Sequence, residues 1–223
     1  MTKYKLLAVM SIGIFLTGCK SLQVAANKPI ESYQSSIKEE SSANELSDSS
    51  EMKTIDSNEG KPMVTEKFEV LLPPFLNNVD GVTELDKNLF TGVQNNFTDK
   101  EINIYEDSLT FINGYTTYSL ETNSIVFIGI IVNNTADTVT DISGNLGSIK
   151  LKNYSDVNIA NGSFKFKKED FDVLKPKQAE VVIITAPVMP TGKEMPTKDI
   201  IFEEKEISAL PYGFEYRVIE AGN

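Results

Sequence analysis

Short apolar runs separated by polar turns fill the chain from residue 67 onward. The most apolar of them is Ile125-Val126-Phe127-Ile128-Gly129-Ile130-Ile131-Val132, which contains no polar residue. A short, β-branched run without polar positions is typical of a strand that is buried on both faces. We therefore expect residues 125–132 to form the central strand of a sheet.

The segment before this run, residues 102–120, is rich in Ile, Thr, Tyr and Phe and predicts further strands. Asn113-Gly114 is by itself a strong signal for a two-residue hairpin. The alternative is one long strand over residues 108–120, bent at Gly114, with the chain reversing at residues 121–124. We favour the long strand, because the central run needs a partner on each side.

After the central run, apolar residues alternate with polar ones between residues 139 and 151. Asn161-Gly162 then separates two apolar segments. A type I′ turn at these two residues would make a hairpin in which Ile159 faces Phe164. A continuous strand with a bulge at Gly162 is the alternative.

Residues 174–178 are expected to form a turn, and further strands are expected over residues 180–186, 199–204 and 214–219. The first of these strands is predicted to stop at Pro187 and Pro190. Residues 73–100 are the least regular part and predict either a helix around residues 82–90 or a long loop. Strands of about five to ten residues separated by turns indicate a mainly β fold, an antiparallel β-sandwich over residues 67–223.

The N-terminal segment is built like a secretory signal. Lys3 and Lys5 give it a positive start, and an apolar run covers residues 6–16. That run is shorter than the roughly 20 residues needed to span a bilayer. Leu16-Thr17-Gly18-Cys19 closes the segment, and Cys19 is the only cysteine of the chain.

This tetrad resembles the lipobox of bacterial lipoproteins. The resemblance implies that diacylglycerol is attached to the thiol of Cys19 and that signal peptidase II cleaves between Gly18 and Cys19. The acyl chains would hold the protein on the cell membrane, facing outside the cytoplasm, without a spanning segment. We therefore expect residues 1–18 to be a lipoprotein signal peptide. An ordinary signal peptide with an incidental cysteine is the alternative.

Residues 19–66 are expected to be a lipidated N-terminus and a disordered linker. They are rich in Ser, Glu, Lys and Asn, and Tyr33 is their only aromatic residue. Such a composition does not bury enough apolar surface to offset the entropy of ordering the chain. The linker would separate the membrane anchor from the sandwich domain.

Charge and residue inventory exclude several classes of function. The chain carries 32 acidic and 21 basic side chains, a formal net charge of −11. Nucleic-acid binding is disfavoured, because it depends on clusters of Lys and Arg. The chain contains no histidine, and acylation of Cys19 leaves no free thiol, so Ser-His-Asp catalysis, Cys-His catalysis and zinc held by His and Cys are excluded. We predict no catalytic, cofactor-binding or metal-binding residue.

Three stretches share a pattern found in immunoglobulin-like (Ig-like) accessory domains on Gram-positive surfaces: Phe127–Thr135, Val157–Phe164 and Leu174–Pro176. An apolar strand ends in Asn, an Ile-Ala step leads to a Phe, and a turn with Pro precedes an apolar strand. The pattern resembles the SLAP domain of surface-layer assembly lipoproteins. The resemblance implies an Ig-like fold and a surface role, and it carries no catalytic or ligand residue onto this chain. The Trp often found near the end of such domains is absent.

Two functions remain open at this point. We favour a non-catalytic module at the cell surface that binds a protein or cell-envelope partner through loops or edge strands. The alternative is a carboxylate-based hydrolase acting on cell-wall glycans, which needs two acids across a cleft. Residues 77–81 and 98–101 are acidic candidates for calcium, but they lack the spacing of an EF-hand loop. Glu203-Glu204-Lys205-Glu206 is expected to be a solvated charge run at a strand end.

Overall fold

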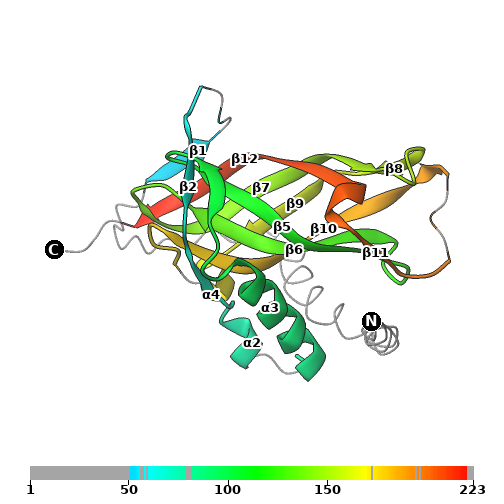
Figure 1. Ribbon diagram of the computed structural model, residues 1–223, viewed down its shortest axis with the longest axis horizontal. Helices are drawn as coiled ribbons and strands as arrows, with labels where there is room; N and C mark the ends of the chain where they lie inside the picture. Colours follow the sequence, from blue (N-terminus) through cyan, green and yellow to red (C-terminus); the bar gives the residue numbers. More distant parts are fainter. Residues whose placement is uncertain are drawn as a thin grey trace, which may run out of the picture.

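The computed structural model describes residues 51–55, 58, 60–78, 82–171, 173–193, 195 and 197–219. Two β-sheets pack face to face, and a helical layer covers the outer side of one of them (Figure 1). The predicted mainly β, antiparallel sandwich is confirmed. The predicted signal peptide, with Gly18 and the lipidation residue Cys19, lies outside the described residues.

The first sheet has the strand order β1-β12-β7-β9, and every pair in it is antiparallel. Its strands are β1 (Met52–Ile55), β12 (Ile207–Ile219), β7 (Thr138–Leu151) and β9 (Gly162–Phe166). A short helix, α4 (Lys168–Phe171), follows β9.

The second sheet has the order β11-β5-β6-β10-β3, in which only β3 runs parallel to its neighbour. Its strands are β11 (Ile200–Phe202), β5 (Leu109–Ser119), β6 (Ser124–Asn133), β10 (Gln178–Gly192) and β3 (Glu69–Leu71). A separate ribbon pairs β2 (Met63–Glu66) with β4 (Ile102–Tyr105), and β8 (Val157–Ile159) pairs with β10.

Strand β6 is the centre of the molecule. It lies between β5 and β10, and every one of its residues is buried. Phe127 contributes to the core between the two sheets, whereas Ile130 contributes to a second core under the helical layer. The predicted central strand with two buried faces is therefore confirmed.

Strand β5 is one long strand rather than a hairpin. It pairs with β6 from Leu109 to Ser119, with a bulge between Asn113 and Tyr115. A side chain at Gly114 would lie 2.9 Å from the ring of Phe97, so the glycine lets the helical layer approach the strand. The chain reverses between Leu120 and Asn123, where Asn123 has a φ of 48°. The favoured long-strand interpretation is confirmed.

The hairpin predicted at Asn161-Gly162 is wrong. Ile159 of β8 pairs with Val188 of β10, whereas Phe164 of β9 pairs with Gly144 of β7. The chain therefore crosses from one sheet to the other at this point, which is also not the single bulged strand of the alternative. The reason is tertiary: a side chain at Gly144 would lie 2.6 Å from Phe164, so the glycine makes room for a ring that also packs 5.6 Å from Phe214.

Strand β10 does not stop at its prolines, as the sequence predicted. It continues to Gly192, and its partner changes from β6 to β8 immediately after Pro187. Proline has no N–H to donate, but the carbonyl oxygen of Pro187 accepts a hydrogen bond from the Ala160 N–H at 2.9 Å. The strand tolerates this proline because it lies where the ladder changes partner.

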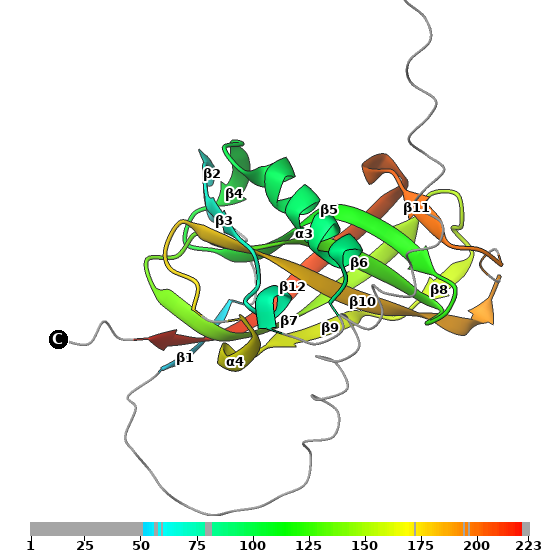
Figure 2. The ribbon, with the colours of Figure 1, turned by 90° about the horizontal axis from the view of Figure 1, so that it is seen from below.

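The third layer consists of α2 (Phe75–Asn78), α3 (Glu84–Phe97) and the β2–β4 ribbon, which lie on the outer face of the second sheet (Figure 2). Residues 84–97 are helical rather than a loop. Thr83 and Asp86 form a capping box, in which the Asp86 N–H donates to Thr83 Oγ1 and the Thr83 N–H donates to Asp86 Oδ2. Phe90 and Val93 bury the inner face of the helix against the second sheet.

The boundary of the folded part also needs a correction. Residues 52–66 were part of the predicted linker, but β1 and β2 lie there and pair with β12 and β4. Ile55 packs on the core between the sheets and Val64 on the core under the helix. Each strand is only four residues long. Its stability therefore comes from a distant partner and is not visible in local composition.

Candidate functional site

The acidic segments proposed for calcium do not form a metal site among the described residues. The turn at residues 98–101 ends α3, where Thr98 Oγ1 donates to the Gln94 carbonyl oxygen and Asp99 has a φ of 63°. The side chains of residues 77–81 lie outside the described part of the structure. Within the described ranges, no group of three or more His, Cys, Asp or Glu residues is placed to hold a metal ion.

The charge run Glu203–Glu206 lies at the end of β11, where Glu204–Glu206 form a short 3₁₀ turn before β12. Lys205 Nζ lies 2.6 Å from Glu203 Oε2, and this hydrogen bond lowers the pKa of Glu203. Both side chains are largely exposed. The segment is therefore a solvated turn with a local ion pair, without a catalytic arrangement.

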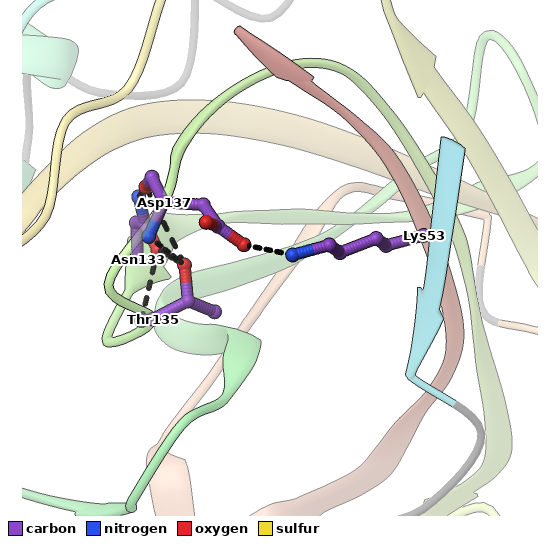
Figure 3. Close-up of polar contacts among 4 residues, drawn as sticks. All are labelled: Lys53, Asn133, Thr135 and Asp137. Atoms are coloured by element: carbon purple, nitrogen blue, oxygen red, sulfur yellow. Dashed lines mark hydrogen bonds and ion pairs between the residues drawn. The ribbon is translucent and has the colours of Figure 1, made fainter. Parts of the chain in front are cut away.

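A buried polar network fixes the turn between β6 and β7. The fully buried Asn133 donates from Nδ2 to the carbonyl oxygens of Asp137 and Leu174, both at 2.9 Å. Its Oδ1 accepts from the N–H and the hydroxyl of Thr135 (Figure 3). Four hydrogen bonds on one buried amide satisfy its polar atoms, which makes Asn133 a structural residue of the turn.

An ion pair connects this turn to β1. Lys53 Nζ lies 2.7 Å from Asp137 Oδ2, across the end of the sandwich (Figure 3). The hydrogen bond to Asp137 raises the pKa of Lys53 above its ordinary value of 10.5, and burial raises the pKa of the neighbouring Tyr216. Because its pKa is raised, Lys53 keeps its charge at neutral pH, and its contribution to stability is lost only as the pH rises through that raised value.

A surface depression of about 630 Å³ lies beside this ion pair. Tyr216 of β12 and uncharged residues of β1 line it, together with five charged side chains: Glu51, Lys53, Lys61, Asp107 and Asp137. Lys61 Nζ donates to the carbonyl oxygen of Asp107, which joins the start of β2 to the turn before β5. The depression is open to solvent and polar, and both signs of charge occur in it.

One edge of β1 is open toward this depression. β1 is the terminal strand of its sheet and, within the described ranges, pairs only with β12. The Val218 N–H donates to the Glu51 carbonyl oxygen, so residues 51, 53 and 55 direct their backbone groups toward β12. Hydrogen-bonding direction alternates along an antiparallel strand, so the N–H and C=O groups of Met52 and Thr54 point to the free edge. Met52 is also 54% exposed.

The edge strand β3 of the second sheet is protected by comparison. The carbonyl oxygen of Val70 accepts a hydrogen bond from Gln94 Nε2 of α3 at 2.7 Å. A shallow groove of about 570 Å³ lies between these two elements. Because a side chain of α3 already occupies an acceptor of this edge, β1 is the more accessible edge of the two.

The sequence did not predict β1 or its free edge. Met52–Ile55 alternates exposed and half-buried residues, but a four-residue alternation is too short a signal in a polar segment. The register between β1 and β12 decides which backbone groups of β1 are free. The sequence of β1 alone does not determine that register.

Comparison with known proteins gives no relative. No protein-family model, curated protein or solved structure matches the chain. The resemblances to the lipobox and to the SLAP domain therefore stay predictions. No helix in the described ranges is both long and apolar enough to cross a membrane.

Proposed function

We propose that this protein is a lipid-anchored, extracytoplasmic, non-catalytic module that binds an extended segment of a protein partner along the free edge of β1. The observation that carries the proposal is the outward direction of the Met52 and Thr54 backbone groups beside an open depression. An extended peptide adds to such an edge through main-chain hydrogen bonds, and neighbouring pockets select its side chains.

The geometry supports binding over glycan hydrolysis. A hydrolase of this kind needs one carboxyl group that stays protonated near neutral pH, beside a second carboxylate. Asp137, one of the acids in the depression, is held in an ion pair with Lys53 instead. The depression is also open rather than a deep cleft, and mixed charges beside a strand edge suit the docking of a peptide.

Thr54→Pro tests this proposal, because it removes the N–H at the free edge and leaves the ladder with β12 complete. A photo-crosslinking amino acid at the exposed Met52 would first identify the partner segment in intact cells. A synthetic peptide of that segment should bind the parent protein and Thr54→Ala, and should bind Thr54→Pro at least about tenfold more weakly, a loss of about 1.4 kcal/mol.

Thr54→Ala is the matched control, since it loses the side chain but keeps the N–H. Unchanged melting of both variants would show that β1 remains in place. Equal binding of the peptide to Thr54→Pro and to the parent would refute docking at this edge.

Cys19→Ser tests the proposed anchor. The thiol is the only acceptor for the acyl chains, so the variant should stay unprocessed or be released in part to the medium. Cell fractionation with detection of the processed form measures this outcome. Unchanged processing and unchanged membrane retention would contradict the lipoprotein proposal, independently of how the β1 edge behaves.

A further inference from the structure

The outer face of the first sheet carries no helical layer among the described residues, because α2, α3 and the β2–β4 ribbon pack on the second sheet (Figure 2). Residues of β12 that precede the bulge at Gly213 alternate between this face and the core. Leu210 and Tyr212 point outward and are 57% and 38% exposed. A large aromatic ring and an aliphatic side chain therefore lie next to each other on an open sheet.

The ring of Tyr212 is held in a fixed position. It lies against Gly147 of the neighbouring strand β7, where an added Cβ would be 2.7 Å from the ring carbon Cε1. Its hydroxyl oxygen accepts a hydrogen bond from Asn161 Nδ2 at 2.8 Å. Contact with Gly147 and a hydrogen bond at the tip of the ring restrict its rotation, so the exposed part of the ring is preorganised.

Uncharged polar groups surround this ring. Asn145 is the ladder partner of Tyr212, and its Oδ1 accepts a hydrogen bond from Ser163 Oγ at 3.0 Å. Charged residues of this face lie in other rows of the ladder: Lys150 is opposite Ser208, and Glu215 and Lys165 lie on either side of Ser143. On a chain with a net charge of −11, this patch of Leu210, Tyr212, Asn145, Asn161 and Ser163 is neutral.

We propose that this patch, the Tyr212 platform, binds an uncharged glycan chain that contains N-acetylhexosamine. The C–H groups on one face of a pyranose ring carry partial positive charge and fit the negative face of a tyrosine ring. The amides of Asn145 and Asn161 offer both donors and acceptors for sugar hydroxyls and for an acetamido group. Leu210 offers an apolar contact to the acetamido methyl group. None of the five residues of the platform carries a charge, which favours an uncharged ligand.

This site is separate from the β1 edge and does not depend on the proposed peptide docking. The test uses the full-length protein in mild detergent and the hexamer of N-acetylglucosamine as the probe. Calorimetric titration should show saturable binding, and saturation-transfer NMR should show the acetamido methyl signal in contact with the protein. Tyr212→Ala should weaken binding by at least about tenfold.

Tyr105→Ala is the matched control. Tyr105 is 36% exposed, close to the value for Tyr212, but it lies on β4 in the third layer, away from the first sheet. Binding should be unchanged in this variant. Tyr212→Phe keeps the ring and should retain binding to the hexamer. Asn145→Ala should weaken that binding. These two variants test the proposal even if Tyr212→Ala does not fold.

Three outcomes would overturn the proposal. The first is absence of saturable binding to the hexamer in the parent protein. The second is an equal loss in Tyr105→Ala and Tyr212→Ala, which would indicate non-specific adsorption. The third is equal binding of a glucose hexamer without acetamido groups, because Leu210 and the two amides would then have no role in recognition.

Discussion

Phe127→Ala and Ile130→Ala are each expected to lower the free energy of unfolding by about 2–5 kcal/mol, the usual range for large-to-small changes in a core. The two side chains leave β6 in opposite directions and are 1% and 0% exposed. Phe127 packs between the sheets, and Ile130 packs under α3. Denaturant melts of the full chain and of each variant would measure both losses.

Ile201→Ala is the matched control for these two changes. Ile201 is also an apolar residue in a strand of the second sheet, but it lies in the edge strand β11 and is 57% exposed. Its replacement should shift stability by no more than about 0.5 kcal/mol. A large loss from only one of Phe127→Ala and Ile130→Ala would mean that β6 has a single buried face.

Gly129→Ala should destabilise the protein by about 3 kcal/mol, the upper part of the usual range for over-packing. The added Cβ would overlap the carbonyl oxygen of Ile112 and would lie 2.8 Å from two ring carbons of Phe111. All three atoms belong to β5, which is bulged opposite this glycine. The strands would have to separate at the centre of the sheet, and thermal or denaturant melts would report the loss.

Gly92→Ala provides the opposite expectation. Gly92 lies on the exposed side of α3, and an added Cβ would meet no atom within 4 Å. Alanine favours the helix and restricts the unfolded chain, so this variant should gain about 0.4–1 kcal/mol. If Gly129→Ala were as stable as the parent, the close approach of β5 and β6 would be wrong.

Elements whose own residues indicate their structure were predictable from the sequence. The apolar run of β6 has no polar position, which is sufficient to place a strand with two buried faces. The chain reversal after β5 followed from the need of β6 for partners on both sides. The helix α3 was one of two alternatives, and its capping box between Thr83 and Asp86 decides in its favour.

Elements that depend on distant partners were not predictable. Asn161-Gly162 has the local composition of a tight turn, but the ring of Phe164 fits over Gly144 of another strand. Pro187 usually ends a strand, but here β10 changes its partner at that residue. The sequence carries local preferences, and these are overridden when a long-range contact buries more apolar surface.

The same reasoning applies to the two proposed binding surfaces. The free edge of β1 is defined by its register with β12, a strand about 160 residues later in the chain. The Tyr212 platform needs Gly147 under the ring and Asn161 at its hydroxyl, from two other parts of the chain. Tyr212 alone, in a sequence with eight tyrosines, gave no signal.

The crossover between β8 and β9 has a mechanical consequence. On that side of the sandwich, one continuous segment bonds to β10 of the second sheet and then to β7 of the first. The sheets cannot part there without breaking ladder hydrogen bonds. Strand β1 is held by its four-residue ladder with β12 and by the ion pair of Lys53 with Asp137 in the β6–β7 turn. Under tension or on heating, the four-residue edge strand β1 should therefore separate from the sandwich before the crossover between β8 and β9 opens.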